Sequence, residues 1–130
     1  MMIIIGHPDV PFDPFYYVEE IDDIPRTPPN CTLWLGPFKE TKTLAKHCDE
    51  NRLPYAVMVA NIKEALLANA LHAHYILSDL KLAETLQKIA DTYLFDAKIL
   101  VPVNDENEME QAAKLGIDGA IFQNAITLPE

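Results

Sequence analysis

The chain has 130 residues, a length that suits one domain whose core is large enough to fold without disulfides or a structural metal. Twenty acidic residues against ten basic ones give a formal net charge of −10, which repels phosphate backbones and anionic lipid surfaces. We therefore expect no nucleic-acid or membrane partner, and we interpret the charge as a solubility feature.

Cysteine usage and the lack of long apolar runs point to the compartment. Cys31 and Cys48 form no CxxC or Cys/His spacing, which favours a reducing environment. Residues 1–5 are apolar, and no basic residue precedes them as in a signal peptide. No later apolar stretch is long enough to span a bilayer. We expect one cytoplasmic domain over residues 1–130.

The first 37 residues differ in composition from the rest, because they contain seven of the ten prolines. Short apolar runs predict strands at residues 2–6, 15–21 and 32–35. Pro25, Pro28 and Pro29 exclude a full helix between the last two strands.

From residue 38 onward the pattern alternates between helices and strands. Helices are predicted at residues 40–51, 62–71, 82–94 and 106–115, and strands at residues 55–60, 75–78, 98–103 and 120–122. These strands are short, aliphatic and not alternating, as parallel strands are when both faces are covered. Pro102 cannot donate to a ladder, so residues 98–103 should form an edge strand or stop pairing before Pro102.

Residues 57–77 align without a gap to residues 101–121, which is an internal repeat of 44 residues. Each copy contains the end of a strand, a helix that begins at Asn61 or Asp105, and the strand that follows. Residues 98–122, with the phrase LGIDG, resemble strand–helix units of phosphate-binding (β/α)8 barrels such as glycerophosphodiester phosphodiesterases. Residues 55–77 are a second copy of that likeness.

The resemblance implies topology, and it transfers no catalytic residue. Gln123 and Asn124 stand where those families place glycines around a phosphate, and a closed barrel needs about 200 residues or more. We expect a three-layer α/β domain with a mainly parallel sheet of five or six strands, Rossmann-like or flavodoxin-like. The alternative is half of a (β/α) barrel, which a second chain could complete.

The helix at residues 62–71 is a candidate interface, because residues 65–71 contain no charged side chain. Either the amino-terminal segment covers it, or Leu66, Leu67 and Ala70 meet a second subunit.

Ligands of parallel α/β folds bind beyond the carboxyl ends of the strands. The candidate ligand-binding residues at those positions are His7, Asp9, Asn61, Asp79, Asn104, Asp105, Gln123 and Asn124. His7 and Asp9 could act as acid and base or share a metal, although a turn fixed by prolines is the simpler interpretation. Asn61, Asp79 and Asp105 are also at helix starts, so we interpret them first as helix caps.

His72 and His74 form an HxH pair that on a strand could bind zinc or nickel. They precede a strand, at the end opposite the expected ligand rim, and we favour a turn or interface role. We therefore assign no metal and no cofactor.

We expect a non-catalytic binding or assembly module, a homodimer through the helix at residues 62–71. The alternative is a small enzyme or sensor that binds a polar metabolite at the carboxyl ends of the strands. The aromatic residues near the amino terminus could instead dock a protein partner, although covering one face of the sheet is the simpler interpretation. They are Phe12, Phe15, Tyr16 and Tyr17.

Overall fold

The computed structural model describes residues 1–127 and contains one sheet of eight strands, all of them parallel, which forms a half-barrel. The strands are β1 (Ile3–Ile5), β2 (Phe15–Tyr17), β3 (Thr32–Pro37), β4 (Tyr55–Met58), β5 (Tyr75–Leu77), β6 (Lys98–Val103), β7 (Gly119–Phe122) and β8 (Ile126–Thr127). Their order in the sheet is β1-β7-β6-β5-β4-β3-β2-β8.

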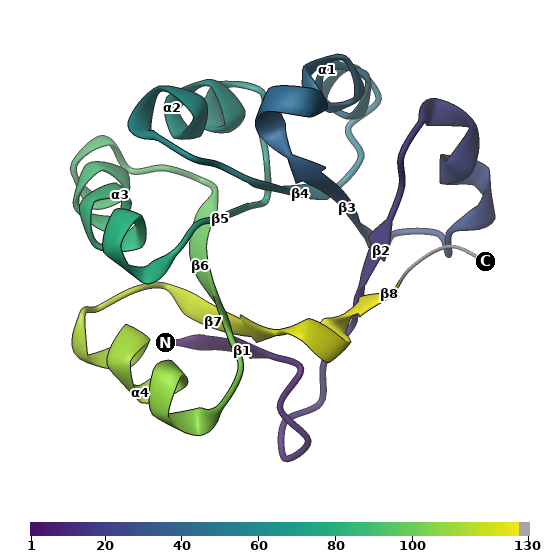
Figure 1. The fold of residues 1–130 in the computed structure, drawn as a ribbon. Helices are drawn as coiled ribbons and strands as arrows, with labels where there is room; N and C mark the ends of the chain where they lie inside the picture. The colour runs from purple at the N-terminus through teal and green to yellow at the C-terminus, as the bar shows by residue number, and fades with distance from the viewer. Residues whose placement is uncertain (128–130) are drawn as a thin grey trace.

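Four α-helices lie around the outside of the curled sheet (Figure 1). They are α1 (Lys42–Glu50), α2 (Ile62–Ala70), α3 (Leu80–Tyr93) and α4 (Glu106–Lys114). Three short 3-10 helices complete the described elements: η1 (Ile21–Arg26), η2 (Phe38–Glu40) and η3 (Gln123–Ala125). The four α-helices are at the predicted places, and α3 begins two residues earlier than predicted.

The curl of the sheet creates two separate apolar clusters. Successive residues of a strand point to opposite faces, so Val57 packs with the helices while Ala56 and Met58 face the inside. The buried residues of the inner cluster are Ile5, Phe15, Ala56, Leu77, Leu100, Ile121 and Ala125. Because these side chains fill the inside, the fold needs no second layer of helices there.

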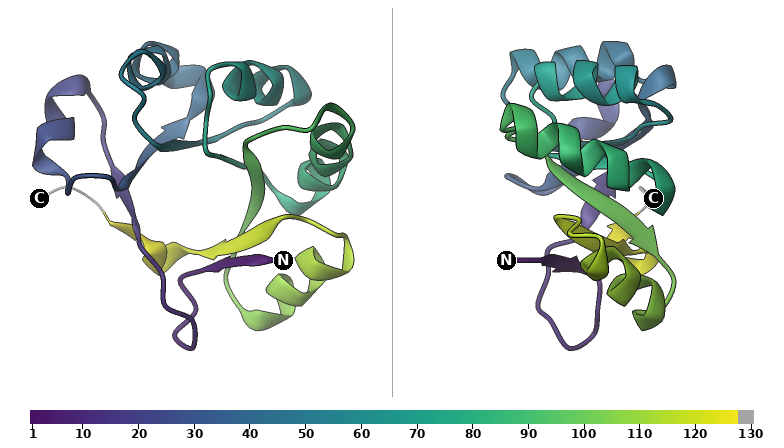
Figure 2. Two further views of the ribbon diagram at one scale, coloured as in Figure 1. Left: turned by 180° about the vertical axis from the view of Figure 1, so that it is seen from behind. Right: turned by 90° about the vertical axis from the view of Figure 1, so that its left-hand side faces the viewer.

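The predicted sheet of five or six strands is wrong, and the half-barrel alternative fits better. The additional strands come from the two ends of the chain, because β1 and β2 join the same sheet and β8 follows η3. The β7 strand continues through η3 into β8, and β8 pairs with β2 on the far side (Figures 1 and 2). The chain thus links the two ends of the strand order.

Of the two alternatives predicted for residues 98–103, the edge strand is wrong, since β6 lies between β5 and β7, but pairing does stop before Pro102 on the β5 side. Its ladder with β5 ends at the pair Leu77 and Leu100, whereas Pro102 is aligned with Ile121 of β7. The proline is accommodated because β5 is too short to reach it.

Candidate functional site

All strands are parallel, so their carboxyl ends lie at one end of the barrel, as predicted. The eight predicted site residues follow β1, β4, β5, β6 and β7 at that end. None of the pockets described within residues 1–127 is lined by these side chains. They divide into a corner around His7 and a series of helix caps.

The corner around His7 is a structural contact between β1 and α4. The Nε2 atom of His7 lies 2.7 Å from Oε2 of Glu106, and the side chain of His7 is only 12% exposed. The backbone N–H of Asp9 donates to Nδ1 at 3.0 Å, so Nε2 carries the ring proton and donates to Glu106. The ring also packs edge-on against Phe122. Both ring nitrogens are therefore engaged.

The predicted pairing of His7 with the Asp9 carboxylate is not what the structure shows. Asp9 contacts the ring through its backbone N–H, in a turn whose backbone closes from Val10 to His7. The turn interpretation accounts for this contact, and the chemical partner of the imidazole is Glu106.

Asn124 is close to this corner, where its Nδ2 donates to the carbonyl oxygen of Gly6 at 3.1 Å. Gly6 has a φ of +100°, and a side chain there would meet Phe122 at 3.0 Å. Gln123 is exposed, and its side chain forms no hydrogen bond within residues 1–127, although its carbonyl oxygen accepts from the backbone N–H of Ile126. This junction joins the ends of β1 and β7. Glycine is needed at position 6 because its backbone lies close to Phe122 and has a positive φ.

The predicted helix caps are present, and the two copies of the repeat share their geometry. Asn61 accepts from the backbone N–H of Glu64 at 2.9 Å, and Asp105 accepts from that of Glu108 at 2.9 Å. In return, each glutamate accepts from the backbone N–H that precedes the cap, at 3.0 Å. For the second copy that donor is the N–H of Asn104. Both are variants of the capping box, in which the glutamate accepts from the residue before the cap instead of from the cap itself.

Asp79 caps α3 in the same way and accepts from the backbone N–H of Leu82 at 2.8 Å. The side-chain oxygens of these three caps each satisfy a backbone donor that the helix leaves free.

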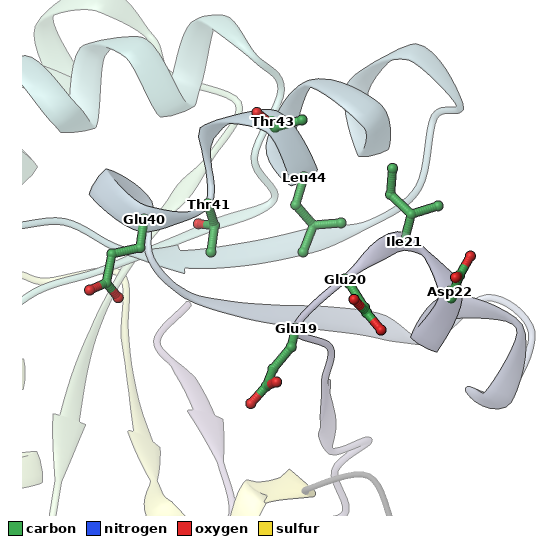
Figure 3. A pocket seen from close by; sticks show the side chains of 8 residues that line it. All are labelled: Glu19, Glu20, Ile21, Asp22, Glu40, Thr41, Thr43 and Leu44. Atoms are coloured by element: carbon green, nitrogen blue, oxygen red, sulfur yellow. The ribbon is translucent and has the colours of Figure 1, made fainter.

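The sequence analysis missed an acidic cavity of about 380 Å³ at the carboxyl ends of β2 and β3 (Figure 3). Its lining residues are Glu19, Glu20, Ile21, Asp22, Glu40, Thr41, Thr43 and Leu44. One side is the segment between β2 and η1, and the other is η2 with the start of α1. The available signal was the group of acids Glu19, Glu20 and Asp22, which overlaps the end of the predicted strand at residues 15–21.

Four carboxylates, those of Glu19, Glu20, Asp22 and Glu40, line this acidic cavity. None of its four carboxylates forms a salt bridge in the described part of the chain. The Tyr17 hydroxyl donates to Glu19 at 3.2 Å. Burial, followed by Glu19 and then by Asp23 and Glu40, raises the pKa of Tyr17 above its ordinary value. The cavity can therefore attract a cationic or hydrogen-bond-donating group.

The outward face of α2 is apolar and exposed. Leu66 is 44% exposed, Leu67 is 43% exposed and Ile62 is 39% exposed, while Ala65 and Ala68 face the core. The amino-terminal segment does not cover this face, because β1 and β2 lie in the sheet and α1 and α3 flank the helix (Figure 1). Of the two predictions for what covers this helix, the amino-terminal segment is wrong, and contact with a second subunit remains a proposal.

Two further properties concern residues 1–127. No group of three or more His, Cys, Asp or Glu side chains there is arranged to hold a metal ion. None of the helices in this range combines the length and the apolar character needed to cross a bilayer.

Comparison with models of known protein families gives no match to this chain, and no curated protein matches it either. The resemblance of residues 98–122 to phosphate-binding barrels therefore stays a prediction.

Proposed function

We propose that this protein is a non-catalytic binding and assembly module that forms a homodimer through the outward face of α2. The exposed leucines Leu66 and Leu67, in the uncharged run of residues 65–71, carry the proposal. Support also comes from the strand ends, where His7 and the helix caps are engaged in internal hydrogen bonds.

Charge supports a second copy of the chain as the partner. In a twofold dimer the same patch meets itself, so any charge in the patch is opposed by a like charge. Residues 65–71 carry no charge in a chain whose net charge is −10, whereas α1, α3 and α4 each carry four or more charged residues. α2 itself carries two charged residues, the exposed Lys63 and the buried Glu64, so it is the least charged of the four α-helices and has the least repulsion to overcome in a self-contact.

The end of α3 carries further exposed apolar side chains. Asn69 near the end of α2 accepts from the backbone N–H of Ala97 at 3.4 Å, so the end of α2 contacts the α3–β6 connection. Tyr93 and Leu94, just before that connection, are 73% and 84% exposed. A standard interface buries about 800 Å² of each partner, about a tenth of this protein's surface of 7749 Å².

Light scattering coupled to size exclusion tests the proposal. We expect the wild-type chain to elute with twice its monomer mass of 14.6 kDa at several hundred micromolar. Leu67→Asp should elute as a monomer, because a twofold interface would bury two carboxylates against each other.

The matched control is Leu115→Asp, because Leu115 at the end of α4 is 40% exposed, close to the 43% of Leu67. This variant should stay dimeric. A wild-type monomer at the highest concentration, or equal dissociation of both variants, would contradict the proposal. Circular dichroism must show that both variants are folded.

A second candidate function is binding of a polar metabolite at the carboxyl ends of the strands, and the 380 Å³ acidic cavity favours it. Its carboxylates and threonine hydroxyls suit a ligand with amino groups.

Calorimetry with spermidine tests this candidate. Glu40→Gln should weaken binding about tenfold, and Glu50→Gln, which removes the same charge at the other end of α1, should not. If Glu40→Gln and Glu50→Gln bind spermidine with equal affinity, the cavity is not the binding site.

A further inference from the structure

A second cavity, of about 280 Å³, lies at the end of the sheet where the strands begin. It is lined by Cys48, Asp49, Arg52, Leu53, His72 and His74. The first four come from the end of α1 and the turn after it, and the two histidines come from the turn between α2 and β5. The α2 surface proposed for dimerisation and the acidic cavity are formed by other residues.

The side chain of His72 is oriented by a carboxylate. Its Nδ1 lies 2.7 Å from Oδ1 of Asp49, and an ionised carboxylate can only accept, so Nδ1 donates. The Nε2 atom of His72 has no partner within residues 1–127. His7 differs, because both of its ring nitrogens are engaged.

Arg52 supplies a positive charge that is not neutralised in the described chain. Arg26, the other arginine, lies 3.7 Å from Asp23, whereas Arg52 forms no salt bridge within residues 1–127. Burial raises the pKa of the Cys48 thiol to about 11, so the thiol is neutral at pH 7. Asp49 is the one carboxylate of the lining, and it is hydrogen-bonded to His72.

The backbone positions of Arg52 and His72 are unusual for residues with side chains. All four α-helices are followed by a left-handed residue: Arg52 (φ 55°), His72 (φ 62°), Leu94 (φ 54°) and Gly116 (φ 71°). Glycine adopts this conformation without strain. Only the two turns that line the cavity place an arginine or a histidine there.

The helix dipole alone does not explain this selection. Carbonyl ends of helices favour nearby cations, but the turns after α3 and α4 have the same geometry and carry Leu94 and Gly116. A basic or imidazole side chain therefore occurs at the left-handed position only in the two turns that line the cavity, and not after every helix.

We propose that this cavity binds a small oxyanion, such as a phosphate group, through Arg52 and the imidazoles of His72 and His74. A guanidinium can contact two oxygens in a bidentate manner. Because the His72 proton is on Nδ1, where Asp49 holds it, the free Nε2 of His72 accepts from a hydroxyl of the phosphate. His74 can then contact another oxygen. A tetrahedral oxyanion has enough oxygens for all three side chains.

Isothermal calorimetry with inorganic phosphate, at constant ionic strength and pH 7, tests the site. The wild-type chain should bind phosphate saturably, with shifted amide NMR signals at residues 52 and 72–74. Arg52→Gln should weaken binding about tenfold or more, because it removes a charge-assisted contact. His74→Gln should weaken it by a smaller factor and provides a second variant.

The matched control is Arg26→Gln, which removes the same charge from the paired arginine and should leave the affinity unchanged. The site would be overturned by a lack of saturable binding up to about 10 mM phosphate, which is well above typical dissociation constants of ligands. Equal phosphate affinity of the wild type and Arg52→Gln would also overturn it. So would an equal loss of affinity in Arg52→Gln and Arg26→Gln. The dimer mass is measured separately, so failure of the α2 interface is distinguishable from failure of this site.

Discussion

The aromatic rings of Phe15 and Tyr75 meet inside the curled sheet, with centroids 5.1 Å apart and planes tilted by 34°. Phe15 is in β2 and Tyr75 is in β5, and β3 and β4 lie between these strands in the sheet order. Two side chains on the same face of a flat sheet, three strands apart, would be about 14 Å apart. Their contact shows how strongly the sheet is curved.

We expect Phe15→Ala to destabilise the fold by about 3–5 kcal/mol, because it leaves a cavity in the inner cluster. Phe15 is 2% exposed, while Phe12, at 36%, is the control whose replacement by alanine should have little effect. Urea denaturation of both variants gives the free energies of unfolding. Equal stabilities would show that the inside of the sheet is not a packed core.

Gly119 is required by the close approach of three strands. A Cβ there would overlap the carbonyl oxygen of Ile3 and lie 2.8 Å from Cδ2 of Leu100. We expect Gly119→Ala to cost about 3 kcal/mol or more by overpacking. Gly116→Ala should cost about 1 kcal/mol, because Gly116 has a left-handed φ but open space around it. Thermal unfolding of the pair distinguishes the two causes.

Leu94 occupies a left-handed backbone position and is 84% exposed, so its side chain gains little in the monomer. Replacement by glycine should stabilise the monomer by roughly 1 kcal/mol. Chemical denaturation at low micromolar concentration measures this gain. If Leu94 is part of the dimer interface, the same variant should dissociate more easily at high concentration, and an unchanged dimer would remove it from the interface.

Cys48 should make stability depend on alkaline pH. Burial raises its pKa from 9.0 to about 11. A group whose pKa is higher in the folded state contributes stability that is present below pH 9 and is lost as the pH rises towards 11. The free energy of unfolding should fall over this range, and less steeply in Cys48→Ala. Cys31→Ser should retain the full slope.

The same shift predicts thiol reactivity. At a given pH below 9, Cys48 should hold about 100-fold less thiolate than an ordinary cysteine. A disulfide reagent should therefore modify the partly exposed Cys31 first, and Cys48 only after unfolding. Rapid modification of both thiols in the native protein would contradict the buried position of Cys48.

Local patterns predicted the helices well. The spacing from Asn61 to Glu64 and from Asp105 to Glu108 is enough to predict the helix caps, because every group involved lies within four residues. The candidate sites depend on longer separations. His7 and Glu106 are 99 positions apart, and Asp49 and His72 are 23 apart, so neither contact has a local signal.

The sequence alone therefore determined that parallel strands alternate with helices from residue 38 onward, because propensity and apolar periodicity act over a few neighbouring residues. Only the tertiary structure decided that β1, β2 and β8 join the same sheet, and that its inside is filled by side chains. Those outcomes depend on strand register and accumulated twist, which arise from pairing between distant segments. The same pairing brings Arg52 and His72 to one cavity and leaves Leu67 exposed.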